Sequence, residues 1–154
     1  MSENRNTPPT TLSPHLTCRQ AAEAVEFYRK AFDANIVHVL TLPDGLVAHA
    51  TLTIGEATVY VTEECPEQKR LGPQGLGGTP VTLHLQVSDC DTVFRRAVEA
   101  GCQVLMPLED QFWGDRYGLV SDPYGHQWAV ATTIRPMNTE ELRSAMETAF
   151  AEPA

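Results

Sequence analysis

The stretch 81–100, VTLHLQVSDCDTVFRRAVEA, contains the two patterns that decide the fold. Residues 81–87 alternate apolar and polar side chains, as a β-strand does when one face of its sheet packs on a core. Residues 91–100 then carry apolar side chains at helical spacing, namely Val93, Phe94, Ala97 and Val98. Gly101 follows as a helix stop. We therefore predict a strand that leads directly into an amphipathic helix.

The same order of elements occurs earlier in the chain. Residues 12–18 are strand-like, and 19–32 form an apolar stripe at helical spacing through Ala21, Ala24, Val25, Tyr28 and Phe32. Three further strands are predicted after each helix, over 35–42, 46–54 and 57–62 in the first half and 103–108, 117–121 and 126–133 in the second. His84 lies 69 residues after His15, and Gly114 lies 69 residues after Gly45. The chain is therefore predicted to contain two βαβββ modules.

Turn residues and composition divide the chain further. Pro43-Asp44-Gly45 is typical of a hairpin, and Asp122-Pro123-Tyr124-Gly125 has the residues of a type I turn. We predict a disordered leader over 1–11, a first module over 12–63 and a Pro/Gly-rich linker or lid over 64–80. A second module over 81–135 and a C-terminal helix with its tail over 136–154 follow.

The last predicted helix, 138–150, begins with a capping box formed by Asn138 and Glu141. Leu142, Met146 and Phe150 then recur every fourth residue. This stripe either docks on the same domain or covers the cavity of a partner in a dimer, and the sequence leaves both alternatives open.

Composition narrows the function classes. The formal net charge is −9, which argues against nucleic acid and anionic membrane surfaces as partners. The four cysteines form no CxxC pair, so neither a zinc knuckle nor a redox motif is indicated. No signal peptide and no apolar run of membrane-spanning length is recognised. We expect a reduced, cytoplasmic protein.

Several phrases resemble the vicinal-oxygen-chelate superfamily, which contains glyoxalases, bleomycin-resistance proteins and ring-cleaving dioxygenases, and more narrowly its PhnB-like branch. The most specific are residues 112–118, FWGDRYG, and 122–128, DPYGHQW. Weaker support comes from 24–32, 49–55 and 87–91. Together these phrases span nearly the whole predicted fold.

The resemblance implies an α+β fold in which two tandem βαβββ modules form a curved eight-stranded mixed sheet around a cavity. Relatives are commonly homodimers, and we expect one here. In metal-using relatives, four inward positions hold a divalent ion; by register these positions fall on Ser13, Tyr60, Thr82 and Ala129. Hydroxyls and a methyl group cannot replace carboxylates and imidazoles. We therefore expect no metal and no other cofactor.

Strand alternation places His15 and His84 on the inward face next to Ser13 and Thr82, with His49 on the third strand. These three histidines can contact a ligand, act as a general base, bind metal, or serve structure alone. A register shift of two residues would bring His15 and His84 onto the metal positions. The predicted ligand-binding set is His15, Thr17, His49, Thr51, Tyr60, His84, Gln86, Trp113, Arg116 and Gln127.

Two tryptophans receive opposite predictions. Trp113 with Arg116 suits a planar, oxygen-rich or anionic ligand; the alternatives are packing under the linker for Trp113, and a salt bridge to Asp115 or Glu109 for Arg116. Trp128 lies on the strand face opposite Gln127, so we expect it in the core.

Three functions follow from this reading. The first is a metal-free cavity that binds a small planar or aromatic molecule, as drug-sequestering relatives do. The alternative is an enzyme of lyase, isomerase or dioxygenase type that uses a divalent metal or a cavity histidine as general base. A third is a regulatory or structural dimer whose cavity has lost its use.

Overall fold

The computed structural model describes residues 6–151. Its elements are β1 (His15–Cys18), α1 (Ala21–Phe32), β2 (Asn35–Thr41), β3 (Val47–Ile54), β4 (Ala57–Glu63), η1 (Pro66–Gln68), α2 (Pro73–Leu76), β5 (Thr82–Gln86), α3 (Cys90–Ala100), β6 (Gln103–Asp110), β7 (Asp115–Ser121), β8 (Gln127–Thr133) and α4 (Thr139–Ala149). The predicted leader, 1–11, lies partly outside the described residues; residues 8–14 form neither helix nor strand.

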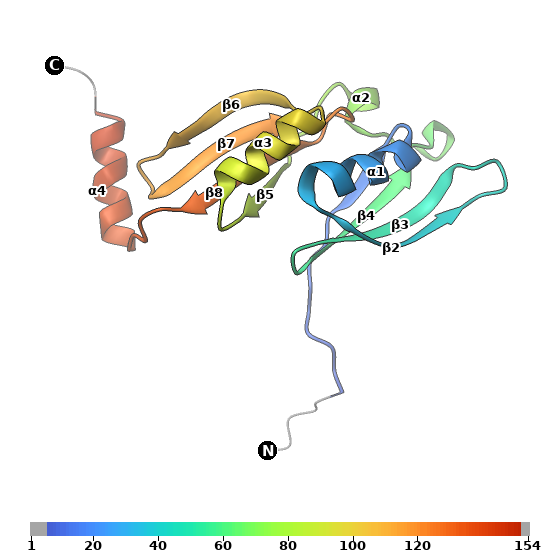
Figure 1. Ribbon diagram of the computed structural model, residues 1–154, viewed down its shortest axis with the longest axis horizontal. Helices are drawn as coiled ribbons and strands as arrows, with labels where there is room; N and C mark the ends of the chain where they lie inside the picture. The colour runs from blue at the N-terminus through green and yellow to red at the C-terminus, as the bar shows by residue number, and fades with distance from the viewer. Residues whose placement is uncertain (1–5, 152–154) are drawn as a thin grey trace.

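The predicted α+β fold with two βαβββ modules is confirmed. The first module forms a sheet of order β1-β4-β3-β2 and the second a sheet of order β5-β8-β7-β6. In each, the first strand runs parallel to the last and the remaining pairs are antiparallel. The eight strands thus form two four-stranded mixed sheets rather than one hydrogen-bonded sheet. Figure 1 shows these sheets side by side, with α1 and α3 on the same side of them.

The repeat extends to the way each helix is attached. The backbone N–H groups of Gln20 and Ala21, at the start of α1, donate to the Glu63 carboxylate at the end of β4. The backbone N–H of Cys90, which begins α3, donates to the Thr132 hydroxyl of β8 at 2.8 Å. The last strand of each module therefore satisfies free N–H groups of its own helix.

The core lies between the helices and the sheets. All five residues of the predicted stripe on α1 are buried, and Phe27 and Ala31 join them. On the facing strands, Leu52 and Val61 are fully buried. On α3, Ala97 is buried, whereas Val98 is exposed. The apolar periodicity of α1 thus identified the packed face correctly, and that of α3 did so in part.

Asp122 joins the two modules. Its buried carboxylate accepts hydrogen bonds from the Tyr28 hydroxyl of α1 at 2.5 Å and from the Trp128 indole N–H of β8 at 2.9 Å. Its other oxygen accepts the backbone N–H groups of Tyr124 and His126. Burial raises the pKa of Tyr28 well above its usual value, so the phenol remains a donor. One side chain thus fixes both the 122–126 turn and its contact with the first module.

The predicted linker 64–80 contains the short helices η1 and α2 and packs tightly against the first strand. A Cβ on Gly72 would lie 2.6 Å from the Thr17 carbonyl oxygen. The Gln74 amide donates to the Pro123 carbonyl at 3.2 Å. We call residues 64–80 the strap, because they cross from one module to the other over the end of β1.

Candidate functional site

The first module gathers ring side chains on the sheet face opposite α1. His15 pairs with Tyr60 across β1 and β4, and their ring centroids lie 5.9 Å apart. The His49 ring of β3 is 5.9 Å from His15 and 5.2 Å from Tyr60. Two imidazoles and a phenol in contact offer a surface for stacking a planar molecule and for hydrogen bonding its oxygens. We call these three residues with Thr51 and His38 the histidine face.

His38 joins this face through Thr51. The Thr51 hydroxyl lies 3.2 Å from His49 Nε2 and 3.0 Å from His38 Nε2. A hydroxyl has one proton, so it donates to one neutral imidazole and accepts from the other. His38 was not among the predicted site residues, because the register of β2 shifts between Ile36 and His38. Its pairing with Thr51 could not be read from alternation.

A cavity separates the first strands of the two modules, next to the histidine face. It measures about 300 Å³ and is lined by Pro14, His15, Leu16, Thr79, Val81, Leu83 and His126. A second cavity of about 150 Å³ shares His15, Thr79 and His126, and adds Thr17 and part of the strap. The predicted residues His15 and Thr17 therefore line hollows that are partly open to solvent, with the strap covering one side.

His126 is a second residue of this region that was not among the predicted site residues. Its Nε2 lies 2.9 Å from the Thr17 carbonyl oxygen. Because a carbonyl only accepts, Nε2 must carry the proton, and a neutral ring leaves Nδ1 as an acceptor. Its place directly after the 122–125 turn is the one sequence signal that could have indicated a position between the modules.

The second module presents a comparable polar and aromatic face. His84 Nε2 lies 2.7 Å from Gln86 Oε1, and the Gln86 amide donates to Thr133 at 2.9 Å. The ring of Tyr117 lies 5.9 Å from that of His84 and 5.6 Å from that of Trp113. We call His84, Gln86, Trp113 and Tyr117 the tryptophan face. Tyr117, which connects Trp113 to His84, was not among the predicted site residues.

Two other predicted residues lie apart from these contacts. Gln127 is half-buried at the start of β8, in register with Thr82. Arg116 requires a correction. Its guanidinium binds Asp91 of α3 at 3.1 Å and Asp110 of β6 at 3.2 Å. Because Arg116 reaches Asp91 of α3, it lies on the helix side of β7, and strand alternation places Tyr117 on the open face. Arg116 therefore does not accompany Trp113 at the candidate site.

The protonation state of His15 suits hydrogen bonding to a ligand. Burial, followed by repulsion from His49 and Arg70, lowers the pKa of His15. The ring is consequently neutral at neutral pH and keeps one nitrogen as an acceptor. By contrast, burial raises the pKa of both the Cys18 and the Cys102 thiol to about 12, so neither supplies a thiolate nucleophile at neutral pH.

The positions that the resemblance implied for a metal do not fit one. Strand pairing places His15, not Ser13, opposite Tyr60, and His84, not Thr82, opposite Ala129. The observed pairing therefore brings both histidines level with Tyr60 and Ala129. Even so, the four positions offer two imidazoles, a phenol and a methyl group. Within residues 6–151, no three His, Cys, Asp or Glu side chains are grouped so that they could hold a metal ion.

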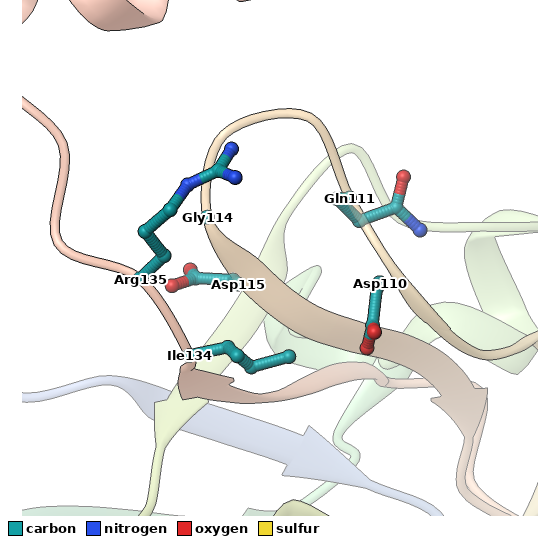
Figure 2. Close-up of a pocket in the computed structure, with 6 residues that line it drawn as sticks. All are labelled: Asp110, Gln111, Gly114, Asp115, Ile134 and Arg135. Carbon is teal, nitrogen blue, oxygen red and sulfur yellow. The ribbon is translucent and has the colours of Figure 1, made fainter.

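A separate small pocket lies at the β6–β7 turn. It measures about 130 Å³ and is lined by Asp110, Gln111, Gly114, Asp115, Ile134 and Arg135. Figure 2 shows these side chains around the turn and the segment after β8. None of the predicted site residues lines this pocket, so we do not include it in the candidate site. Over the described part of the chain, no helix is long and apolar enough to cross a membrane.

Comparisons with known proteins identify a family profile and a similar protein for this chain. The profile of the Glyoxalase/Bleomycin resistance protein/Dioxygenase superfamily matches residues 10–130. The chain is 48% identical over 138 residues to the uncharacterized protein Rv0887c of Mycobacterium tuberculosis, covering 88% of this chain and 81% of that protein.

Solved structures are similar as well. TioX from Micromonospora sp. ML1 matches with a TM-score of 0.66 and 27% identity, covering 81% of this chain and 99% of TioX. A putative 3-demethylubiquinone-9 3-methyltransferase, PhnB protein, from Bacillus cereus matches with a TM-score of 0.63 and 22% identity over 80% of this chain and 99% of that one.

Proposed function

Because the chain belongs to the glyoxalase/bleomycin resistance protein/dioxygenase superfamily, we propose that it binds a small planar or aromatic molecule without a resident metal. The observation that carries this proposal is the pair of ring-lined open faces. One contains His15, His49 and Tyr60 within 6 Å of each other. The other contains Trp113, Tyr117 and His84. Such surfaces bind by stacking and by neutral hydrogen bonds.

The chemistry of the two faces supports a ligand that carries oxygen atoms. Neutral imidazoles, the Tyr60 phenol, the Thr51 hydroxyl and the Gln86 amide both donate and accept hydrogen bonds. Arg116 forms salt bridges with Asp91 and Asp110. The other residues of the predicted ligand-binding set include no lysine or arginine. Phenols, quinones and polycyclic antibiotics are therefore better candidates than polyanions. Capture of such a molecule needs no chemical step, which favours sequestration.

The branch of the superfamily and the location in the cell are also part of this proposal. The PhnB-like branch is supported by the 112–118 and 122–128 phrases and by the likeness in fold to the Bacillus cereus protein. A reduced, cytoplasmic location fits the four unpaired cysteines.

Ligand binding should depend on both faces. In a thermal-shift screen of phenolic acids, quinones and aromatic antibiotics, we expect hits whose dissociation constants rise about tenfold in Trp113→Ala and in His49→Ala, as loss of one stacking partner predicts. Arg116→Ala is the matched control, because it changes the same motif on the opposite strand face, and it should leave affinity unchanged. Hits that bind a Trp113→Ala/His49→Ala protein as tightly as the natural one would place the site elsewhere.

Metal content separates this proposal from a metal-dependent enzyme. Protein purified without a histidine tag should contain less than about a tenth of an equivalent of divalent metal by elemental analysis, because the residues at the family's metal positions supply no carboxylate. A stoichiometric ion that survives mild chelation and is lost in His15→Ala would contradict the proposal. It would favour lyase, isomerase or dioxygenase chemistry instead.

A further inference from the structure

Three hollows adjoin one another along the boundary between the two modules, whose sheets Figure 1 shows side by side. The largest, of about 300 Å³, shares His15, Thr79 and His126 with the hollow of about 150 Å³ under the strap. It shares Pro14 and Leu83 with a third hollow of about 180 Å³ that extends along β5. We call the largest of the three, with its seven lining residues given above, the seam hollow.

The lining of these hollows carries no formal charge. The chain has 20 acidic and 11 basic residues, yet within residues 6–151 no aspartate, glutamate, lysine or arginine lines any of the three. The seam hollow contains only His15, Thr79 and His126 besides apolar side chains. The Thr79 hydroxyl already accepts the Val81 N–H at 3.2 Å. Walls of this kind favour a neutral ligand, because a charged one would lose its hydration without gaining a counter-charge.

His126 is the polar group of the seam hollow whose hydrogen bonding is half complete. Its Nε2–H donates to the Thr17 carbonyl of the other module, which fixes the ring and leaves Nδ1 as an acceptor. Over the described part of the chain, Glu64 Oε1 is the one buried side-chain nitrogen or oxygen without a hydrogen-bond partner. Because Nδ1 of the half-buried His126 forms no hydrogen bond within those residues either, it is not buried. This nitrogen is therefore open to a hydrogen-bond donor.

His15 lines the same two hollows from the first module. Burial lowers the pKa of His15, so this ring is neutral at neutral pH and also keeps an acceptor nitrogen. Acceptor nitrogens from opposite modules favour a ligand that donates a hydrogen bond. Small-molecule sites measure about 300 to 1,000 Å³, and the seam hollow lies at the lower end of that range. Its size suits an aromatic compound of one or two rings.

We propose that the seam hollow binds a neutral, hydroxyl-bearing aromatic compound of one or two rings, and that His126 selects it by accepting a hydrogen bond from its hydroxyl at Nδ1. Leu16, Val81 and Leu83 contact the ring. A phenol satisfies Nδ1, whereas a methyl ether or a quinone has no proton to donate and keeps water from the nitrogen. This inference rests on the proposed function, and it narrows the ligand from aromatic compounds in general to phenols.

Fluorescence titration with 2-naphthol and its methyl ether, 2-methoxynaphthalene, tests the selectivity at neutral pH. The natural protein should bind 2-naphthol at least about tenfold more tightly. In His126→Gln the amide nitrogen takes the place of Nε2 and still donates to Thr17, but no acceptor takes the place of Nδ1, so the ratio of the two affinities should fall to about one. In His126→Asn the amide oxygen takes the place of Nδ1, so the selectivity should be retained.

Gln74→Ala is the matched control for these variants. It removes the neighbouring hydrogen bond from the strap to Pro123, and Gln74 lines none of the three hollows, so the selectivity should be unchanged. Equal affinity of the natural protein for the two compounds, or selectivity that persists in His126→Gln, would overturn the inference and leave the proposed function standing. If neither compound binds and the wider screen gives no hit, both fail.

A second pair of variants tests the position of the ligand. Val81 lines the seam hollow and is 59% exposed, so Val81→Trp fills the hollow without disturbing the core. It should weaken 2-naphthol binding at least about tenfold. Val104→Trp makes the same change at a 42% exposed valine of β6 that lines none of the three hollows, and should leave the affinity unchanged. A Val81→Trp protein that binds 2-naphthol as tightly as the natural one would exclude the seam hollow and place the ligand on the open faces.

Discussion

Replacing Asp122 with alanine is expected to lower the free energy of unfolding by about 3 to 5 kcal/mol, because two buried donors lose their acceptor. The Tyr28 hydroxyl and the Trp128 indole N–H would both be left facing a small apolar side chain. For a domain of this size, the melting temperature should fall by roughly 10 °C. Chemical denaturation followed by circular dichroism measures the loss.

Asp115→Asn provides the control for that experiment, since Asp115 is a partly exposed aspartate on β7 whose carboxylate forms no hydrogen bond or salt bridge within the described residues. It should change stability by less than about 0.5 kcal/mol. Tyr28→Phe combined with Asp122→Ala should cost less than the sum of the two changes, because both remove the same hydrogen bond. Additive losses would mean that Asp122 does not connect the modules through Tyr28.

The two tryptophans should respond in opposite ways to alanine substitution. Trp128 is 2% exposed and stacks on Phe32 with a centroid distance of 4.4 Å. Its removal leaves a cavity between α1 and the second sheet, and should cost about 3 to 5 kcal/mol of unfolding free energy. Trp113 is half-buried on the open face. Its removal should cost about 1 kcal/mol or less while weakening ligand binding.

Two measurements on each variant, stability and ligand affinity, distinguish the roles of Trp113 and Trp128. Urea denaturation gives the stability of each variant, and calorimetric titration with the best hit of the screen gives its affinity. Equal stability losses would refute the assignment of Trp113 to the open face. A Trp128→Ala protein that folds normally would show that the intermodule core does not depend on the Phe32 stack.

The sequence predicted the repeat well because its signals are local. Apolar periodicity identified the stripe of α1, and the type I turn residues at 122–125 form a turn in which the Gly125 N–H donates to the Asp122 carbonyl at 3.1 Å. The 69-residue spacing of the predicted repeat also relates the strand pairings of the two modules, His15 with Tyr60 and His84 with Ala129. Each of these features depends on residues close together in the chain or on one constant spacing.

The candidate site was predicted less completely, for reasons visible in particular residues. Register shifts within β2 brought His38 to Thr51, and such bulges depend on how two strands pair. Arg116 was predicted to accompany Trp113 because the two are close in the sequence, whereas its guanidinium binds Asp91 of α3 and Asp110 of β6. His126 reached Thr17 only because the 122–126 turn packs against the other module.

The sequence by itself thus determined the βαβββ repeat, the core position of Trp128 and the set of polar and aromatic side chains that can line a hollow. Only the tertiary structure decided which of them meet, how the strap covers His15 and Thr17, and that α4 lies at the opposite end of the molecule from the β2–β3 hairpin. Periodicity fixes the face of an element on which a side chain lies. The relative position of two modules depends on contacts such as Tyr28 with Asp122, between residues that lie 94 positions apart in the chain.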